Sequence, residues 1–392
     1  MTRSHPCLAA AILAVGIVTV PVVAIHAEPP AAPPPATAAR APATAISAGV
    51  DERVELLSII ARLAGNPEYN MKNSASPYAS RVEEWFGHSR EHAAITMFRE
   101  GRRQFGWSYD AVPCLAVHLT AFPELAERMP IDADPRPPRL DKRWNPEFTR
   151  QWLDQVRDFI KVTSAAGFFD QEREFYGKVN ERMAAFVRET DPVPWFDSFF
   201  GAKAGASYQV IPGLVCGGSN YGVGVVFLDG SPEEIRPVLG CWKWDKDGLP
   251  EFATEAYLPT FIHELAHSYV NPFVERHAGV IDPPFAAMYP SIAAAMKRKA
   301  YATARTVACE TIVRAVVIRY LHDRLGPGAG EAEKFRQKRE GFPWAGGLAD
   351  VLGAYSADRT KYPALDDFTP TIAEHMESIA KTMTSPGEVA PR

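Results

Sequence analysis

Residues 258–272 read LPTFIHELAHSYVNP and contain an HExxH motif, formed by His263, Glu264 and His267. Residues four apart on a helix lie on one face, so both imidazoles can bind one metal ion at about 2.0–2.1 Å. Glu264 then projects toward the open coordination position, where it can take a proton from water and return it to a leaving amine. The motif predicts one Zn²⁺ ion that polarises a substrate carbonyl, with Glu264 as the catalytic general base.

The residues around the motif favour a functional site. LPTFI precedes it and SYVNP follows it, which predicts a largely buried helix at 257–270 that stops at Asn271-Pro272. Two histidines and a glutamate on a buried helix are costly unless a partner satisfies them. The alternative is that they are core side chains hydrogen-bonded to the backbone.

Glu310 is the first candidate for a third ligand, since catalytic zinc takes three protein ligands and keeps one position for water. It lies on an apolar face of a helix predicted at 297–325, where a carboxylate needs a strong partner. His277 is an alternative ligand that would reach the ion through a loop. In a further alternative, Glu310 only forms an ion pair with Arg314, one helical turn away.

Arg314 is predicted to act in catalysis in one of two ways. It either orients Glu310, or it neutralises the developing oxyanion or holds a substrate carboxylate. Two histidines on one helix and a glutamate on a later helix form the ligand set of gluzincins, the thermolysin-like class. Those enzymes carry Asp one turn after the ligand Glu, where this chain has Arg314. The partner that steadies either histidine is therefore not predicted.

The order of predicted elements indicates an α+β fold. Apolar residues at helical spacing predict helices in the first half, at 51–64, at 78–102, and as a pair within 146–188 separated near Gly167. From Ala206, a segment rich in Val, Tyr and Gly predicts two or three short antiparallel strands and a further strand near 238–242. Helices return at 257–270, 297–325, 346–356 and 370–383. We expect a zincin-like, gluzincin catalytic domain, mainly helical, with a small antiparallel or mixed sheet before the HExxH helix.

The N-terminus has the layout of a secretory signal peptide, with Arg3 before an apolar run at 8–24 and Ala27 at the cleavage point. Export to the periplasm or the medium follows, without stable membrane insertion after signal removal. A permanent transmembrane anchor is the weaker alternative, because Gly16 and Pro21 interrupt the run. The predicted divisions are a signal peptide at 1–27, an Ala/Pro-rich linker at 28–47, a helical region with the sheet at 48–250, the HExxH-containing region at 251–385 and a tail at 386–392. The two large regions should pack as one catalytic unit.

Charge and cysteine usage narrow the classes of partner and scaffold. The net charge of −5 and the absence of a basic run argue against nucleic acid or an anionic membrane as partner. The cysteines beyond the signal peptide are too widely spaced for a disulfide scaffold or a zinc ribbon. They are Cys114, Cys216, Cys241 and Cys309. A Cys216–Cys241 disulfide is one expectation, and buried free thiols are the other.

Further segments run through most of the chain in a recognisable order. They are DERVELLSIIARLAGNPEYN (51–70), FGWSYDAVPCLAVHL (105–119), PWFDSFFG (194–201), SNYGVG (219–224), CETIVRA (309–315) and YSADRTKYPALDDF (355–368). Together with the HExxH segment they resemble a mostly bacterial family known as domain of unknown function 4932. The resemblance implies a zincin family with matching positions at His263, Glu264, His267 and Glu310, and it implies no substrate.

In gluzincins an edge strand before the HExxH helix pairs with the substrate backbone. The strand predicted from Tyr221 to Leu228 stands in the right chain order for this role, so Asn220 and Tyr221 are predicted to bind substrate. The alternative is a strand turn that needs the glycine at 222. Residues that could stabilise the transition state are Tyr257, Tyr269, Tyr320, Tyr355 and Arg359, although a Tyr beside an apolar helix is more often a core residue.

These features predict an exported zinc metallopeptidase that cleaves amide bonds in a peptide or protein substrate. One alternative is a zinc amidase acting on non-peptide or cell-wall amides. The other is a non-catalytic exported zinc-binding protein, whose ion would be closed off by four protein ligands.

Overall fold

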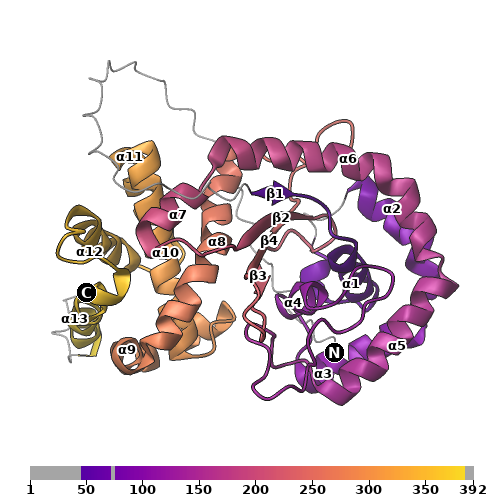
Figure 1. The fold of residues 1–392 in the computed structure, drawn as a ribbon, viewed down its shortest axis with the longest axis horizontal. Coiled ribbons are helices and arrows are strands. Elements are labelled where there is room, and N and C mark those ends of the chain that lie inside the picture. Colours follow the sequence, from indigo (N-terminus) through magenta and orange to yellow (C-terminus); the bar gives the residue numbers. More distant parts are fainter. Residues whose placement is uncertain (1–45, 72–75, 385–392) are drawn as a thin grey trace, which may run out of the picture. The chain divides into compact units, whose positions relative to one another are not determined.

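The computed structural model describes residues 46–71 and 76–384, all within one compact unit, Ala43–Arg392. The predicted signal peptide, nearly all of the predicted linker and the predicted tail lie outside the described residues. The chain is mainly helical with a small sheet, so the predicted α+β class is confirmed (Figure 1).

The described chain begins with the short strand β1 and a series of helices, and the other three strands of the sheet follow them. They are β1 (Ser47–Ala48), α1 (Glu52–Leu63), η1 (Pro67–Tyr69), α2 (Pro77–Phe86), η3 (Gly87–Ser89), α3 (Ala93–Phe105), α4 (Ala111–Val117), α5 (Pro146–Val162), α6 (Ala165–Thr190), α7 (Val193–Phe200), β2 (Ser207–Gly213), β3 (Tyr221–Val225) and β4 (Glu234–Gly240). The single helix predicted at 78–102 is wrong. It is divided at η3, after which the His92 imidazole accepts the N–H of Ala94 and starts α3.

Six helices follow the sheet in the described part of the chain. They are α8 (Thr254–Arg276), α9 (Ala278–Arg298), α10 (Ala304–Leu325), α11 (Pro327–Arg339), α12 (Ala345–Ala357) and α13 (Leu365–Thr384). The predicted stop at Asn271-Pro272 is wrong, because α8 continues to Arg276. Burial of Phe273 and Val274 offsets the N–H that Pro272 lacks.

The helix predicted at 297–325 is two helices. Residues 297–298 close α9, and Ala300 then takes a left-handed conformation with φ of 69°, which a helix cannot continue through. Thr303 starts α10 by accepting the N–H of Thr306 at 3.1 Å. α9 as a whole was not predicted from the sequence, because prolines inside it are typical of a helix break.

The sheet is mixed, with strand order β1-β2-β4-β3. β1 pairs with β2 and β2 with β4 in parallel, whereas β3 pairs with β4 antiparallel. The expectation of antiparallel strands therefore holds only for the β3–β4 pair. It fails elsewhere because β4 returns into the sheet between β2 and β3.

Alternate side chains of the strands enter two separate cores. Ile211, Val223 and Val238 belong to a core with α1 to α5 and the first part of α6. Val210 and Leu239 belong to a second core with α8, α9, α10, α12 and α13. This alternation follows from the two-residue period of a strand. The sheet therefore separates an N-terminal helical layer from a C-terminal one, as Figure 1 shows.

The cysteines of the described residues are free thiols, so the Cys216–Cys241 disulfide is wrong. Both side chains are buried, and the Cys216 thiol donates to the carbonyl oxygens of Gly213 and Ser219. Burial raises the pKa of Cys216 to about 12, which keeps the thiol protonated.

None of the described helices combines the length and the apolar character that crossing a membrane requires.

Glu55 links α1 to the sheet from a fully buried position. It accepts the N–H of Leu214 at 2.9 Å and the hydroxyl of Tyr78 at 3.2 Å. Burial is the main cause that raises its pKa from 4.5 to about 8, and the two hydrogen bonds lower it only in part. The folded protein therefore keeps a proton on Glu55 that the unfolded chain has already released.

We predict that the fold becomes less stable as pH rises, because Glu55 stays protonated in the folded protein after the unfolded chain has released this proton. The contribution of Glu55 is fully present below pH 4.5 and is lost as pH rises through about 8, a loss on the order of a few kcal/mol. Urea unfolding at pH 5 and pH 8 should show this loss in the parent and a smaller one in Glu55→Gln. Glu84→Gln, at an exposed position, is the control and should behave as the parent.

Candidate metal centre

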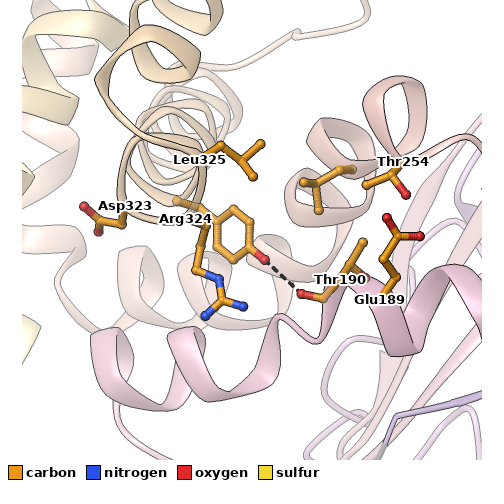
Figure 2. A pocket seen from close by; sticks show the side chains of 8 residues that line it. Glu189, Thr190, Thr254, Asp323, Arg324 and Leu325 are labelled. Atoms are coloured by element: carbon orange, nitrogen blue, oxygen red, sulfur yellow. Dashed lines mark hydrogen bonds between the residues drawn. The ribbon is translucent and has the colours of Figure 1, made fainter. Parts of the chain in front are cut away.

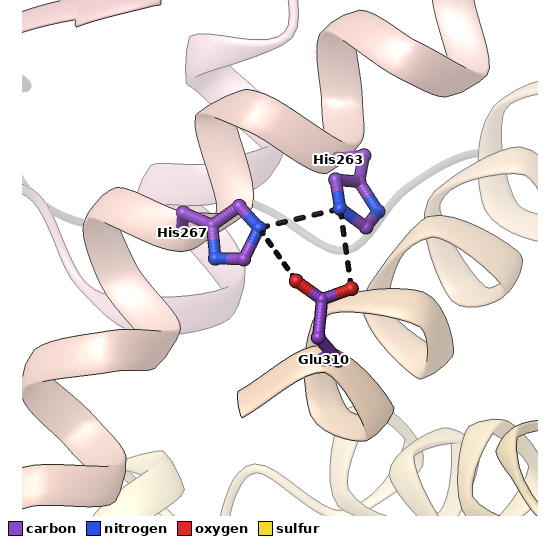
Figure 3. A group of neighbouring side chains, drawn as sticks. All are labelled: His263, His267 and Glu310. Atoms are coloured by element: carbon purple, nitrogen blue, oxygen red, sulfur yellow. Dashed lines mark hydrogen bonds and ion pairs between the residues drawn. The ribbon is translucent and has the colours of Figure 1, made fainter. Parts of the chain in front are cut away.

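α8 and α10 pack against each other in the C-terminal layer and carry the three predicted ligands. His263 and His267 lie one turn apart on α8, and Glu310 lies on the facing side of α10 (Figure 3). Both helices are largely buried, so a polar side chain that lies between them needs a polar partner. The helix pair thus brings the predicted ligand group together.

The ligating atoms converge on one point between the helices. His263 Nε2 lies 3.2 Å from His267 Nε2 and 3.6 Å from Glu310 Oε2, and His267 Nε2 lies 3.4 Å from Glu310 Oε1. Four ligands placed tetrahedrally at about 2.0–2.1 Å from an ion are about 3.3–3.4 Å apart. The spacing therefore fits a small ion bound by nitrogen and oxygen, and this group could hold a metal ion.

Two further observations agree with a cation at this point. Oε2 of Glu310 is buried and has no hydrogen-bond partner within the described residues, although Arg314 lies 3.3 Å away. Burial lowers the pKa of His263 well below its ordinary value, and His267 and Arg314 lower it further. The neutral imidazole that results is the form that binds metals.

Glu264 lies on α8 between the two ligand histidines and is only 8% exposed. Burial, and next the Glu310 carboxylate, raise the pKa of Glu264 well above its ordinary value, whereas Arg314 lowers it. The backbone N–H of Gly222 on β3 also lowers this pKa in part. The predicted general base is therefore a buried carboxyl close to the ligand group.

Both terminal nitrogens of the Arg314 guanidinium have polar partners. One arm of the guanidinium donates to Gln337 and, at 2.7 Å, to Glu340, and the other donates to Tyr301 Oη at 3.1 Å. The guanidinium also lies 4.2 Å from the centre of the Phe342 ring. Of the two predicted roles, these contacts favour orienting Glu310, since binding a substrate would cost Arg314 its partners.

Two residues at the site were not found from the sequence. Asn271 Oδ1 lies 3.1 Å from His267 Nδ1, so it can steady this ligand. Tyr301 lies in the break before α10, with its hydroxyl in hydrogen-bonding reach of Glu310. Asn271 stands one turn after His267, a signal hidden by the expected helix stop at Pro272. Tyr301 has no comparable signal.

The other candidates lie away from the ligand group. His277 Nε2 pairs with Asp366 Oδ1 at 2.7 Å, which removes the alternative ligand. The hydroxyls of the four candidate tyrosines are satisfied by core partners, as expected for structural residues. Tyr257 binds Gly240, Tyr269 binds Tyr208, Tyr320 binds Thr190 and Tyr355 binds Phe199, while Arg359 donates to Ser198, Phe199 and Pro363.

The two residues predicted to bind substrate make structural contacts in the sheet and in the core. Asn220 accepts the N–H of Gly240 through Oδ1 at 3.0 Å, and Tyr221 is buried in the N-terminal core. β3 is nevertheless an edge strand of the sheet and lies against α8, as the prediction requires. A role of either side chain in substrate binding stays a prediction.

A cavity of about 300 Å³ lies where the C-terminal ends of α6 and α10 meet the start of α8 (Figure 2). Thr190, Thr254 and Arg324 are among its lining residues, and the Tyr320 hydroxyl crosses it to the Thr190 carbonyl at 3.3 Å. None of the predicted ligands lines it, so it is separate from the metal centre.

The fold and the site define a mainly helical α+β protein with a potential metal centre of two histidines and one glutamate from two helices. Residues 153–374 match the family described as Domain of unknown function (DUF4932), and the chain belongs to this family. The matched segment contains all three potential ligands. No curated protein and no solved structure matches the chain.

We predict that Asn271→Ala weakens zinc binding about 10- to 100-fold, because His267 loses the partner that fixes its ring. Asn271 is exposed, so the fold should be unaffected. Competition with a chromophoric chelator measures the affinity. Asn271→Asp keeps the acceptor and should bind zinc at least as well as the parent. Glu275→Ala, exposed one turn further along α8, is the control. Equal affinities for Asn271→Ala and the control would remove the role of Asn271.

Proposed function

We propose that the protein is an exported, zinc-dependent hydrolase that cleaves amide bonds in peptides or proteins. The observation that carries this proposal is the convergence of His263, His267 and Glu310 within 3.2–3.6 Å, with the buried carboxyl group of Glu264 beside them. Export rests on residues 1–27, which read as a signal peptide and lie outside the described residues.

The number of ligands favours catalysis over a purely structural ion. Structural zinc sites are closed by four protein ligands, whereas catalytic sites use three and keep one position open. Among the described residues, three side chains form the potential ligand group and no fourth His, Cys, Asp or Glu joins it. When bound, zinc supplies Lewis-acid polarisation of a carbonyl and makes water a stronger nucleophile near neutral pH.

The protein's own residues supply the remaining chemistry. Glu264 takes a proton from the attacking water and passes it to the leaving amine, as a general base and then a general acid. Its burial and the adjacent Glu310 carboxylate raise the pKa of Glu264, so its ionised form is a stronger base toward the proton of the attacking water. Arg314 and Tyr301 hold Glu310, and Asn271 holds His267, so the ligand group is fixed before substrate arrives.

We predict that Glu264→Gln retains zinc and loses turnover by about 10²–10⁴-fold, because the amide cannot accept the proton. Zinc content is measured by elemental analysis of the purified chain, and turnover by release of fluorescent fragments from labelled casein. His277→Gln changes a histidine outside the ligand group and is the control. Turnover of Glu264→Gln equal to that of the parent would show that the base is another group.

A metal and substrate survey separates the remaining alternatives. The purified chain is loaded with zinc and offered peptide libraries and cell-wall fragments in parallel. Cleavage of peptides supports the proposed peptidase, and cleavage of wall amides alone identifies a non-peptide amidase. Stoichiometric zinc with no water in its coordination sphere, measured by X-ray absorption, would identify a non-catalytic zinc-binding protein.

A further inference from the structure

β3 is an edge strand of the described sheet and packs against the HExxH helix. β3 lies at the end of the strand order and pairs only with β4 within the described sheet. In this ladder Gly222 lies opposite Pro237, which has no N–H to donate. Gly222 therefore does not belong to a hydrogen-bonded pair, and its N–H and C=O point away from β4.

The carbonyl of Gly222 already has a partner, because it accepts Nη2 of Arg139 at 3.0 Å. The Arg139 side chain therefore occupies the position where a peptide could pair with this carbonyl as a further strand.

Gly222 also lies directly against α8. A Cβ atom at this position would be 2.5 Å from the Glu264 carbonyl oxygen and 2.9 Å from the Cβ of His267. Real Cβ atoms do not approach so closely, so only glycine allows this contact. The strand therefore touches the helix between the general base and a metal ligand.

Arg139 connects this contact to the rest of the fold. The Nη2 atom that binds Gly222 also donates to Ser268 Oγ on α8 at 3.2 Å. Its Nη1 donates to Glu233 Oε1 at 2.7 Å, and Glu233 also binds Lys203. The side chain is 16% exposed, and Arg139 has a left-handed φ of 67°. Such a conformation is strained in a residue other than glycine and persists only where the surroundings hold it.

We propose that Arg139 is a positioning residue that clamps Gly222 against α8, which holds the turn of α8 that carries Glu264 in its reactive place. The role in turnover rests on the proposed hydrolase function. The clamp also closes the edge of β3 at Gly222, so a peptide substrate binds without adding a strand there. Arg139 touches no ligand atom and acts through Gly222 and Ser268.

The chain offers a matched control in Arg128. Arg128 pairs with Glu234 at 2.7 Å with exposures of 20% and 19%, against 16% and 14% for Arg139 and Glu233. It donates to Val117 and Glu234 and to neither Gly222 nor Ser268. Arg128→Met therefore removes a similar half-buried ion pair from the same end of β4 and leaves the clamp intact.

The test compares Arg139→Met with Arg128→Met in the full chain. We expect Arg139→Met to lower kcat on labelled casein by about 10²-fold, with KM and zinc content close to those of the parent. Amide exchange measured by mass spectrometry should become about tenfold faster in peptides covering residues 219–225, because β3 loses the contact that holds it against α8 and opens more often. Arg128→Met should change neither quantity.

A second variant covers the case in which Arg139→Met does not fold. Arg139→Lys keeps the charge opposite Glu233 but loses the planar fork, so exchange in 219–225 should still rise and kcat should fall about tenfold. Equal exchange and kcat in the Arg139 and Arg128 variants would overturn the clamp. Faster exchange with unchanged kcat would overturn its role in positioning Glu264. If the parent cleaves no amide, the proposed function fails, and the exchange data alone decide whether Arg139 holds β3.

Discussion

Two carboxyl groups buried side by side impose the constraint on which this structure depends. Glu264 and Glu310 are 8% and 7% exposed, and each lies on a helix whose neighbouring side chains are apolar. Two such groups cannot both ionise without a compensating charge. Arg314 supplies one positive charge 3.3 Å from Glu310, and burial lowers the pKa of His263 well below its ordinary value, so that this imidazole supplies none. A divalent cation would supply the charge that is still missing. The cost of burying the two carboxyl groups therefore favours the binding of a metal ion.

The surrounding elements hold this group from three directions. The break at Ala300 lets α9 end and α10 begin so that Glu310 faces α8, and it places Tyr301 beside the carboxylate. The end of α11 and the residues after it bind Arg314. On the opposite side β3 contacts α8 at Gly222. Because each element is packed in the core, the ligand group is positioned by the fold itself, without dependence on exposed loops.

The sequence was sufficient where local pattern and chemistry coincide. HExxH spacing identified His263 and His267, and an isolated carboxylate on an apolar helix identified Glu310. It failed where tertiary packing overrides a local rule. Pro272 read as a helix stop, yet burial of the residues after it continues α8 and brings Asn271 to His267. Parallel pairing of β2 with β4 joins distant segments, so no local pattern could predict it.

Arg139 was beyond sequence reasoning for the same reason, because its partners Gly222 and Ser268 lie far along the chain. The position of Arg139 shows that metal binding and the pairing of a substrate with the edge strand make different demands on the structure. Two histidines and a glutamate can hold an ion in a gluzincin-like manner, whereas substrate pairing along an edge strand also requires free backbone groups. Here the carbonyl group of Gly222 is engaged by Arg139. The three potential metal ligands and the carbonyl at the edge of β3 are therefore held by different parts of the fold.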